Sequence, residues 1–315
     1  MGGDRPTRAD DEFVDLRPLL FSIAYRMLGS VSDAEDVVQD TYLRYHNAVR
    51  EGVAIESPKA YLSAITTRLA IDVLRSARVR RETYVGQWLP EPLLTDPAAP
   101  DPAAHSAESD SLSMAFLLVL ERLSPIERAV FLLHDVFGYG FDEIAGIVDK
   151  SAANCRQIAV RARRHVNDNR PRFEASRAER DRLADSFVAA LSNGDVDRLV
   201  GLLAADVVVT GDADEAGPRW PRPIVGRDKV VRLLLGVGAQ LRDVPGVTIE
   251  RVEVNGQPGA AVRDGEGRLV NVFSFDITDG VVSTVRSVLR RDKLRHLGPL
   301  ADVAALWASR RGTDG

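Results

Sequence analysis

The sequence predicts two all-α modules followed by a third domain of mixed α+β structure. Three observations lead to this prediction. The chain has 315 residues, more than one hydrophobic core usually supports. An acidic, proline-rich stretch at residues 87–111 separates two regions of helical periodicity. Beyond about residue 175, short apolar runs alternate with Asn-Gly and Asp-Gly turns, which are typical of β-hairpins.

Composition excludes several classes of protein. The apolar fraction is 45% and the charged fraction 28%, as expected for a soluble globular chain rather than a disordered one. No run approaches the ~18 apolar residues of a membrane span, and the polar N-terminus shows no signal peptide. The single cysteine, Cys155, cannot form an internal disulfide. We therefore expect a cytoplasmic protein with no membrane partner. Its net charge of −5 means that any nucleic acid must be bound by local basic patches.

The first module, residues 10–86, is predicted to be helical. A capping box at Ser32–Glu35 begins a helix whose less polar stripe consists of Ala34, Val38, Thr41, Tyr45 and Ala48. Ser57-Pro58 begins a second helix, which buries Leu62, Ile65, Leu69 and Val73. The outer face of this second helix is basic and presents Lys59, Arg68, Arg75, Arg78, Arg80 and Arg81.

A linker is predicted at residues 87–111. Between Glu91 and Asp110 there is no lysine or arginine, whereas the acidic residues and prolines are frequent. Proline removes backbone hydrogen-bond donors, and low hydrophobicity removes the gain from packing. The stretch should therefore separate the helical modules without a core of its own.

The sequence pattern of the second module, residues 112–168, predicts a helix-turn-helix. Ser124-Pro125 begins a helix that ends at Gly138, and a short amphipathic helix follows at residues 141–148. A turn at Asp149-Lys150, where aspartate tolerates the left-handed conformation, leads to a basic helix from Ser151. This helix has the small, polar and arginine side chains needed to enter a DNA major groove, namely Ser151, Asn154, Arg156, Gln157, Arg161, Arg163 and Arg164. Arg156 and Gln157 are placed to read base edges, and the later arginines to bind phosphates.

The third domain, residues 175–295, is predicted to be an α+β cone with an antiparallel sheet. A tail follows at residues 296–315. Helices are expected at residues 180–191, 196–203 and 229–241. Strands are expected at residues 207–210, 247–254, 260–263, 269–277 and 281–289. Tight turns at Asn255-Gly256, Asp264-Gly265 and Asp279-Gly280 separate the later strands.

Residues 13–84 and 112–165 resemble the two conserved domains of an extracytoplasmic-function (group IV) sigma factor of bacterial RNA polymerase. The motifs that carry the resemblance are Asp33–Asp40, then Pro58–Leu62 with Ile71–Arg75, and the helix-turn-helix, in that order around a linker. The resemblance implies a chain without enzymatic activity or cofactor that binds core RNA polymerase and promoter DNA.

The resemblance also assigns roles to residues. Asp33, Asp36, Gln39 and Asp40 would contact basic residues of the polymerase clamp. The loop at residues 47–58 would hold a flipped base of the promoter −10 element, and Lys59, Arg68, Arg75, Arg78, Arg80 and Arg81 would hold the strand backbone. Asp72 is interpreted as an ion-pair partner of these arginines. The helix-turn-helix would read the −35 element.

Residues 178–289 resemble a SnoaL-like domain of the nuclear-transport-factor-2-like (NTF2-like) fold, and a recognised group of sigma factors has this appendage. Two further motifs match that group, Trp88-Leu89-Pro90-Glu91-Pro92 in the linker and Asp292-Lys293-Leu294 near the C-terminus. A glycine-rich loop of the group survives only as Gly211-Asp212-Ala213-Asp214. The resemblance implies that the domain modulates sigma activity within the chain. We expect Trp88–Pro92 to pack on the cone close to Gly211 and Asp212.

Two alternatives remain open. The same cone fold hosts isomerases and cyclases, which need an internal acid or base, and Asp206, Asp212 and Asp214 are the available carboxylates. We interpret these three as surface loop positions. A ligand-sensing helix-turn-helix regulator, with the cone as the pocket of an unidentified ligand, is the second alternative. Five scattered histidines and one cysteine do not predict a metal site.

Overall fold

The chain is represented by a computed structural model, which describes residues 8–81, 87–95, 111–168, 176–214, 222–303 and 305. Contacts divide the chain into two compact units. The helical unit contains residues up to 83 together with 117–170. The second unit contains residues 84–116 and everything from 171 onward, so that the described parts of the linker belong to the sheet domain. Within the described residues, no helix combines the length and apolar character needed to cross a bilayer.

The first part of the helical unit is a three-helix bundle of α1 (Arg8–Leu28), α2 (Val31–Arg50) and α3 (Pro58–Arg81). The predicted stripe on α2 is confirmed, because all five of its residues are buried. The predicted N-cap is wrong by two residues. Ser30, not Ser32, precedes the helix, and its Oγ accepts a hydrogen bond of 3.1 Å from the N–H of Asp33.

The second part of the helical unit contains the end of α5 (Met114–Leu120), whose first three residues belong to the second unit. It continues with α6 (Pro125–Phe131), a π-helical turn (Leu132–Val136), α7 (Phe141–Val148) and α8 (Ala152–Asn167). Ser124 and Glu127 form the predicted capping box at the start of α6. The helix-turn-helix is confirmed as α7 and α8, with Asp149 at φ 53° between them. The helix expected to continue to Gly138 instead widens at Leu132, where the carbonyl accepts from the N–H of Phe137 five residues later.

The sheet of the second unit has the order β1-β4-β5-β6-β7-β2-β3. Its strands are β1 (Leu94–Thr95), β2 (Leu203–Asp212), β3 (Ile224–Val225), β4 (Thr248–Val254), β5 (Gln257–Arg263), β6 (Leu269–Thr278) and β7 (Val281–Val288). The expectation of a purely antiparallel sheet is wrong at one pair, because β2 and β7 run parallel. The four-stranded meander β4–β7 ends with β7 running in the direction of β2, which precedes it in the chain.

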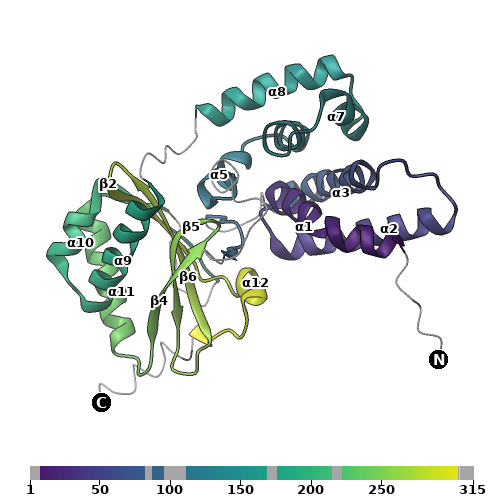
Figure 1. The fold of residues 1–315 in the computed structure, drawn as a ribbon. Helices are drawn as coiled ribbons and strands as arrows, with labels where there is room; N and C mark the ends of the chain where they lie inside the picture. The colour runs from purple at the N-terminus through teal and green to yellow at the C-terminus, as the bar shows by residue number, and fades with distance from the viewer. Residues whose placement is uncertain are drawn as a thin grey trace, which may run out of the picture. The chain divides into compact units, whose positions relative to one another are not determined.

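Three helices cover one face of this sheet, α9 (Arg177–Asn193), α10 (Val196–Leu202) and α11 (Arg227–Arg242), as Figure 1 shows. The core between helices and sheet is apolar, and Phe187 meets Phe275 edge to face at 5.0 Å between ring centroids. The predicted α+β cone is confirmed. A short helix α12 (Arg291–Leu294) and a 3-10 turn (Arg295–Leu297) follow the last strand.

The opposite face of the sheet is buried, and it combines polar residues with apolar ones such as Val272 and Val288. Strand alternation places Asp212, Ser274, Asp276 and Arg286 on this face. Asp276 and Arg286 form a bidentate ion pair with distances of 2.7 and 2.6 Å. The Oγ of Ser274 donates to the sulfur of Met114 at 3.2 Å, and β1 extends the sheet at β4. The two described ends of the linker thus lie against the sheet domain.

Candidate functional site

The acidic residues of α2 lie on the side of the helix away from the buried stripe. Asp36, Gln39 and Asp40 are exposed, and Asp33 is half-buried in the first turn. Within the described part of the chain, neither Asp36 nor Asp40 has an ion-pair partner, whereas Glu35 on the flank of this face is paired with Arg17. The face therefore presents uncompensated negative charge to solvent.

The basic residues of α3 are less uniform than the sequence suggested. Lys59 is exposed, with its ammonium 5.6 Å from the ring centre of Tyr139. Arg75 pairs with Asp72 at 3.3 Å, which confirms the structural reading of that aspartate. Arg78, Arg80 and Arg81 lie in α3, but their side chains fall outside the described residues.

Arg68 has a partner that the sequence did not indicate. Its guanidinium donates to the carbonyl oxygens of Ile147 at 3.0 Å and Gly146 at 2.6 Å, near the C-terminal end of α7. These carbonyls lie at the negative end of the helix, where an arginine is favoured. Ser63 of α3 also shares a hydrogen bond of 2.7 Å with the hydroxyl of Tyr139, and burial raises the pKa of that phenol. Helix α3 is thus attached to the helix-turn-helix part of the unit.

The outer face of α8 is formed by residues that recur at helical spacing. The exposed residues include Ala153, Arg156, Gln157, Val160, Arg161 and Arg164. The inner face is apolar and includes Cys155, which is fully buried. Ser151 caps the helix by accepting from the N–H of Asn154 at 3.2 Å.

Three of the arginines predicted to contact DNA on α8 have intramolecular partners. Arg163 donates to Asp135 at 2.6 Å, and Arg156 lies over the ring of Phe141, 5.5 Å from its centre. Arg161 lies 3.9 Å from a carboxylate oxygen of Glu127. Arg164 and Gln157 extend from the same face without such a contact among the described residues. The free part of the surface is therefore Gln157, Val160 and Arg164, with Arg156 at its edge.

The predicted regulatory motifs meet at one buried ion pair. The ammonium of Lys293 lies 2.6 Å from Asp212, and both residues are buried, with 6% and 2% of their surface exposed. The interpretation of Asp212 as a surface loop position is therefore wrong, because it is the last residue of β2 and faces the linker. Burial lowers the pKa of Lys293, and the Asp212 carboxylate opposes this shift.

The linker supplies the remaining partners of this pair. Asp212 accepts a hydrogen bond of 3.0 Å from the backbone N–H of Leu89, and Lys293 donates to the carbonyl of the same residue. The indole ring of Trp88 lies 4.5 Å from the Lys293 ammonium. These contacts place Trp88 and Leu89 next to Asp212, the position expected from the sequence.

The other members of the two motifs lie around this pair. The Nε2–H of His296 donates to the carbonyl oxygen of Pro92 at 2.8 Å, and Nδ1 of the same ring lies 3.9 Å from a carboxylate oxygen of Glu91. Pro90 and Leu294 are buried, and Asp292 pairs with Arg290 at 3.1 Å. Gly211 precedes Asp212 on β2. His296 belongs to the predicted tail, yet the chain stays packed on the sheet as far as Val303.

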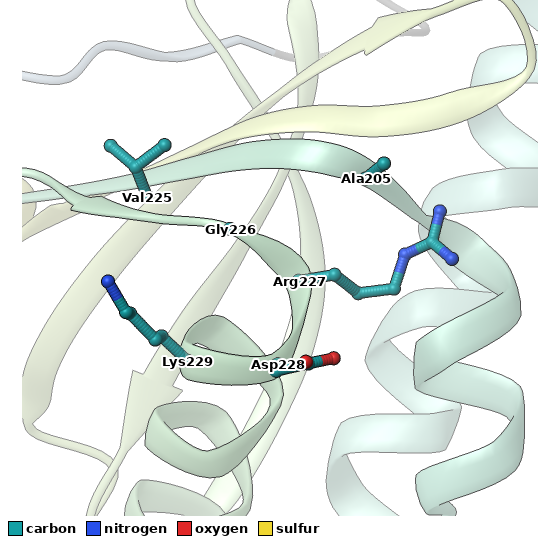
Figure 2. Close-up of a pocket in the computed structure, with 6 residues that line it drawn as sticks. All are labelled: Ala205, Val225, Gly226, Arg227, Asp228 and Lys229. Carbon is teal, nitrogen blue, oxygen red and sulfur yellow. The ribbon is translucent and has the colours of Figure 1, made fainter.

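Figure 2 shows a pocket of the sheet domain, with a volume of about 450 Å³, at the start of α11. Its lining consists of Ala205, Val225, Gly226, Arg227, Asp228 and Lys229. The pocket is open to solvent, and the side chain of Lys229 points away from those of Arg227 and Asp228. The charged groups therefore do not converge on a common point, as a binding site for a small molecule would require.

Comparisons with known proteins agree with these features. Residues 13–80 match the Sigma-70 region 2 family and residues 113–166 match Sigma-70, region 4. The ECF RNA polymerase sigma factor SigJ of Mycobacterium tuberculosis is 38% identical over 292 residues, covering 90% of this chain and 92% of SigJ. The probable ECF sigma factor SigI of the same organism is 31% identical, covering 89% and 93%.

A solved structure extends the likeness to three dimensions. The crystal structure of M. tuberculosis SigJ covers 92% of this chain and 99% of its own, with 35% identity and a TM-score of 0.71. The match therefore includes the sheet domain as well as the two helical regions. With 38% identity over 90% of its length to SigJ and matches to both Sigma-70 regions, the chain belongs to the ECF RNA polymerase sigma factors.

Proposed function

We propose that this chain binds core RNA polymerase and directs transcription initiation at promoters with −10 and −35 elements. The observation that carries the proposal is the exposed basic face of α8, preceded in the chain by the uncompensated acidic face of α2. A simple DNA-binding regulator would need only the helix-turn-helix, so the acidic face favours the polymerase-binding function over the ligand-sensing alternative.

Each face has one role in this proposal. Asp33, Asp36, Gln39 and Asp40 bind basic residues of core polymerase. Lys59 and the arginines of α3 hold the separated −10 strand. Of the loop predicted at residues 47–58, the ends belong to α2 and α3, and the connection at 51–57 that precedes Lys59 receives a flipped base. Arg68 can take part only after it leaves the α7 carbonyls. Attachment of α3 to the helix-turn-helix therefore represents a closed form that must open on promoter DNA.

Transcription in vitro tests the proposal. Core polymerase supplied with the full chain and a promoter library should yield transcripts from a defined subset of promoters. Core polymerase alone, and the chain alone, are the two controls. Absence of chain-dependent transcripts, together with specific binding of the chain to duplex DNA, would instead support the simple regulator.

We expect Arg156 and Arg164 to differ in how they affect DNA recognition. Arg156→Ala should cost about 1–3 kcal/mol of binding free energy and relax preference at one base position, because it lies early on the outer face. Arg164→Ala should weaken all sequences alike, since a phosphate contact has no sequence information. Arg163→Ala should also act uniformly, but it additionally removes the ion pair with Asp135. The measurement is holoenzyme affinity for a −35 library at several salt concentrations. Identical profiles for all three variants would contradict this division.

The sheet domain is proposed to regulate the helical regions through the linker. Trp88 and Leu89 are held by the Asp212–Lys293 pair, so the chain between the two DNA-binding regions is anchored to the regulatory domain. A sigma factor must present both regions at the separation of the two promoter elements, and a linker anchored to the sheet domain disfavours that separation. Core polymerase would then have to overcome the docking free energy, on the order of a few kcal/mol.

We do not propose catalysis in the sheet domain. The interior between its helices and sheet is lined by apolar residues. Of the candidate carboxylates, Asp206 is exposed, Asp212 is paired with Lys293 on the opposite face, and Asp214 lies at the end of β2 beside Arg290. None of the three lies in that apolar core, where an acid or base of an isomerase would be needed.

A further inference from the structure

The turn between β4 and β5 is an unusual two-residue hairpin turn. Asn255 and Gly256 both have positive φ, 55° and 69°, as a type I′ turn requires. Such turns usually lie at the surface, because their polar groups are satisfied by water. Asn255 has 0% of its surface exposed. Something other than water must therefore satisfy its amide.

The linker satisfies it at two places. The N–H of Leu93 donates to the side-chain oxygen of Asn255 at 3.0 Å, and the backbone N–H of Asn255 donates to the carbonyl of Leu93 at 2.8 Å. The side-chain NH₂ of Asn255 donates to the carbonyl of Leu112 at 3.1 Å. Leu93 precedes the acidic part of the linker and Leu112 follows it. One side chain thus binds both ends of that segment.

Neighbouring contacts fix the first of these ends in register. Leu94 and Thr95 pair with Val254 and Glu253 as strand β1. The hydroxyl of Thr95 donates to Glu253 at 2.8 Å and accepts from the N–H of Gly256 at 3.1 Å. The edge of β4 and the turn that follows it therefore form a continuous receptor for the linker.

The chemistry of the position favours asparagine over other residues. A carboxamide is the only short side chain with both an acceptor and an NH₂ donor, and asparagine tolerates the left-handed region. Aspartate would keep the acceptor but could not donate to Leu112. Glycine would keep the turn and lose both side-chain bonds. The chain itself shows that aspartate fits such a turn, since Asp279 has φ 51° before Gly280 between β6 and β7.

We infer that Asn255 is a positioning residue that joins the two ends of the linker and so limits how far apart the two DNA-binding regions can move. About 30 residues separate α3 from α5, and an extended chain of that length would reach about 100 Å. When Leu93 is held next to Leu112, only about 13 residues connect α3 to α5. An extended chain of that length reaches about 45 Å.

The promoter sets the distance that has to be covered. Elements about 25 base pairs apart lie about 85 Å apart along B-DNA, at about 3.4 Å per base pair. The extended length of the free linker exceeds this separation. The extended length of the linker with Leu93 held next to Leu112 is smaller than this separation. The hydrogen bonds of Asn255 to Leu93 and Leu112 therefore oppose simultaneous binding of both promoter elements. These bonds break when the chain assembles with polymerase on DNA. This last step rests on the proposed function.

Hydrogen exchange on the isolated full chain tests the contact without polymerase. Asn255→Gly should raise exchange about ten-fold in the peptide covering residues 111–117, because the side-chain bond to Leu112 is lost, and by a smaller factor in 87–95, where the N–H of Leu93 loses its acceptor while the β1–β4 pairing remains. Asn255→Asp should raise it mainly in 111–117, because only the bond to Leu112 is lost. Asp279→Gly, an exposed position in the equivalent turn, is the matched control and should change neither peptide. Unchanged exchange in Asn255→Gly would overturn the inference whether or not the chain is a sigma factor.

Transcription distinguishes a positioning residue from a merely structural one. Asn255→Gly should lower the concentration of chain needed for half-maximal transcription about three- to ten-fold, with Asn255→Asp between it and the native chain. A structural role alone would raise that concentration, because less folded chain would be present. An increase in Asn255→Gly, with faster exchange, would therefore refute the positioning role. Absence of transcription from native and variant chains alike would count against the proposed function and leave the exchange result standing.

Discussion

The double substitution Asp36→Lys and Asp40→Lys is expected to reduce binding to core polymerase at least about 100-fold, since like charges brought together at an interface cost several kcal/mol. Both carboxylates are exposed on α2, and neither supports the fold through an ion pair among the described residues. The substitution changes the charge of this face by four units without removing a buried contact. The dissociation constant of the fluorescently labelled chain with core polymerase is the measurement.

The matched control for this prediction is Asp15→Lys, an exposed position on α1 of the same helical bundle. It should bind core polymerase as the native chain does. Circular dichroism and the melting temperature of the double variant should remain close to native, because its substituted side chains lie in solvent. Native affinity in the folded double variant would remove α2 from the polymerase interface.

Features that depend on neighbouring residues could be predicted from the sequence. The buried stripe of α2 and the capping box at Ser124 follow from spacing within one or two helical turns. The turns at Asn255 and Asp279 follow from the Asn-Gly and Asp-Gly pairs. The helix-turn-helix follows from the patterns of α7 and α8 and from Asp149 in the turn between them. In each case the deciding interaction is local.

The individual partners of side chains that pair over long distances in the chain could not be predicted, although the family resemblance indicated that Trp88–Pro92 lies near Asp212. Nothing near Asp212 in the sequence shows that Lys293 will pair with it, and so a buried carboxylate was interpreted as a surface one. Arg68 has the exposed, outward position of a DNA contact, yet it binds carbonyls of a helix nearly eighty residues later. The Asn255 turn was predicted, but its role in holding the linker was not. A side chain's choice between water, DNA and another part of the chain is decided by tertiary packing.

The parallel pairing of β2 with β7 has a similar origin. Periodicity predicts that a segment is a strand, but the strand's neighbour and direction depend on how the chain returns. In the chain, β3 and α11 lie between β2 and the meander. In the sheet, β2 pairs with β7, the last strand of the meander.

Release of the linker from the Asp212–Lys293 pair is expected to raise transcription at limiting concentrations of the chain. Lys293 binds the carbonyl of Leu89 and Asp212 binds its N–H, so the pair holds the linker eight residues after the end of α3. Truncation after Leu289 removes Lys293 and should change transcription without abolishing it, because the helical regions remain. Removal of residues from about 175 onward should change core or promoter affinity.

Point variants test this expectation more specifically than truncation does, because truncation also removes Ala301 and Val303, which pack on the sheet. Lys293→Met alone should destabilise the sheet domain by about 3–5 kcal/mol, since it leaves the Asp212 carboxylate buried without its cation. Adding Asp212→Asn should recover most of that stability, because the buried charge is gone, while the ammonium that binds Leu89 and Trp88 remains absent.

The double variant Asp212→Asn, Lys293→Met is therefore the informative chain, since it separates loss of the anchor from loss of the fold. At matched concentration and salt it should be more active than the native chain in transcription with core polymerase, and residues 87–95 should exchange faster. Lys229→Met, an exposed lysine on α11, is the control for removing one positive charge and should behave as native. Equal transcription from the native chain, the double variant and both truncations would show that the sheet domain does not restrain the DNA-binding regions through this pair.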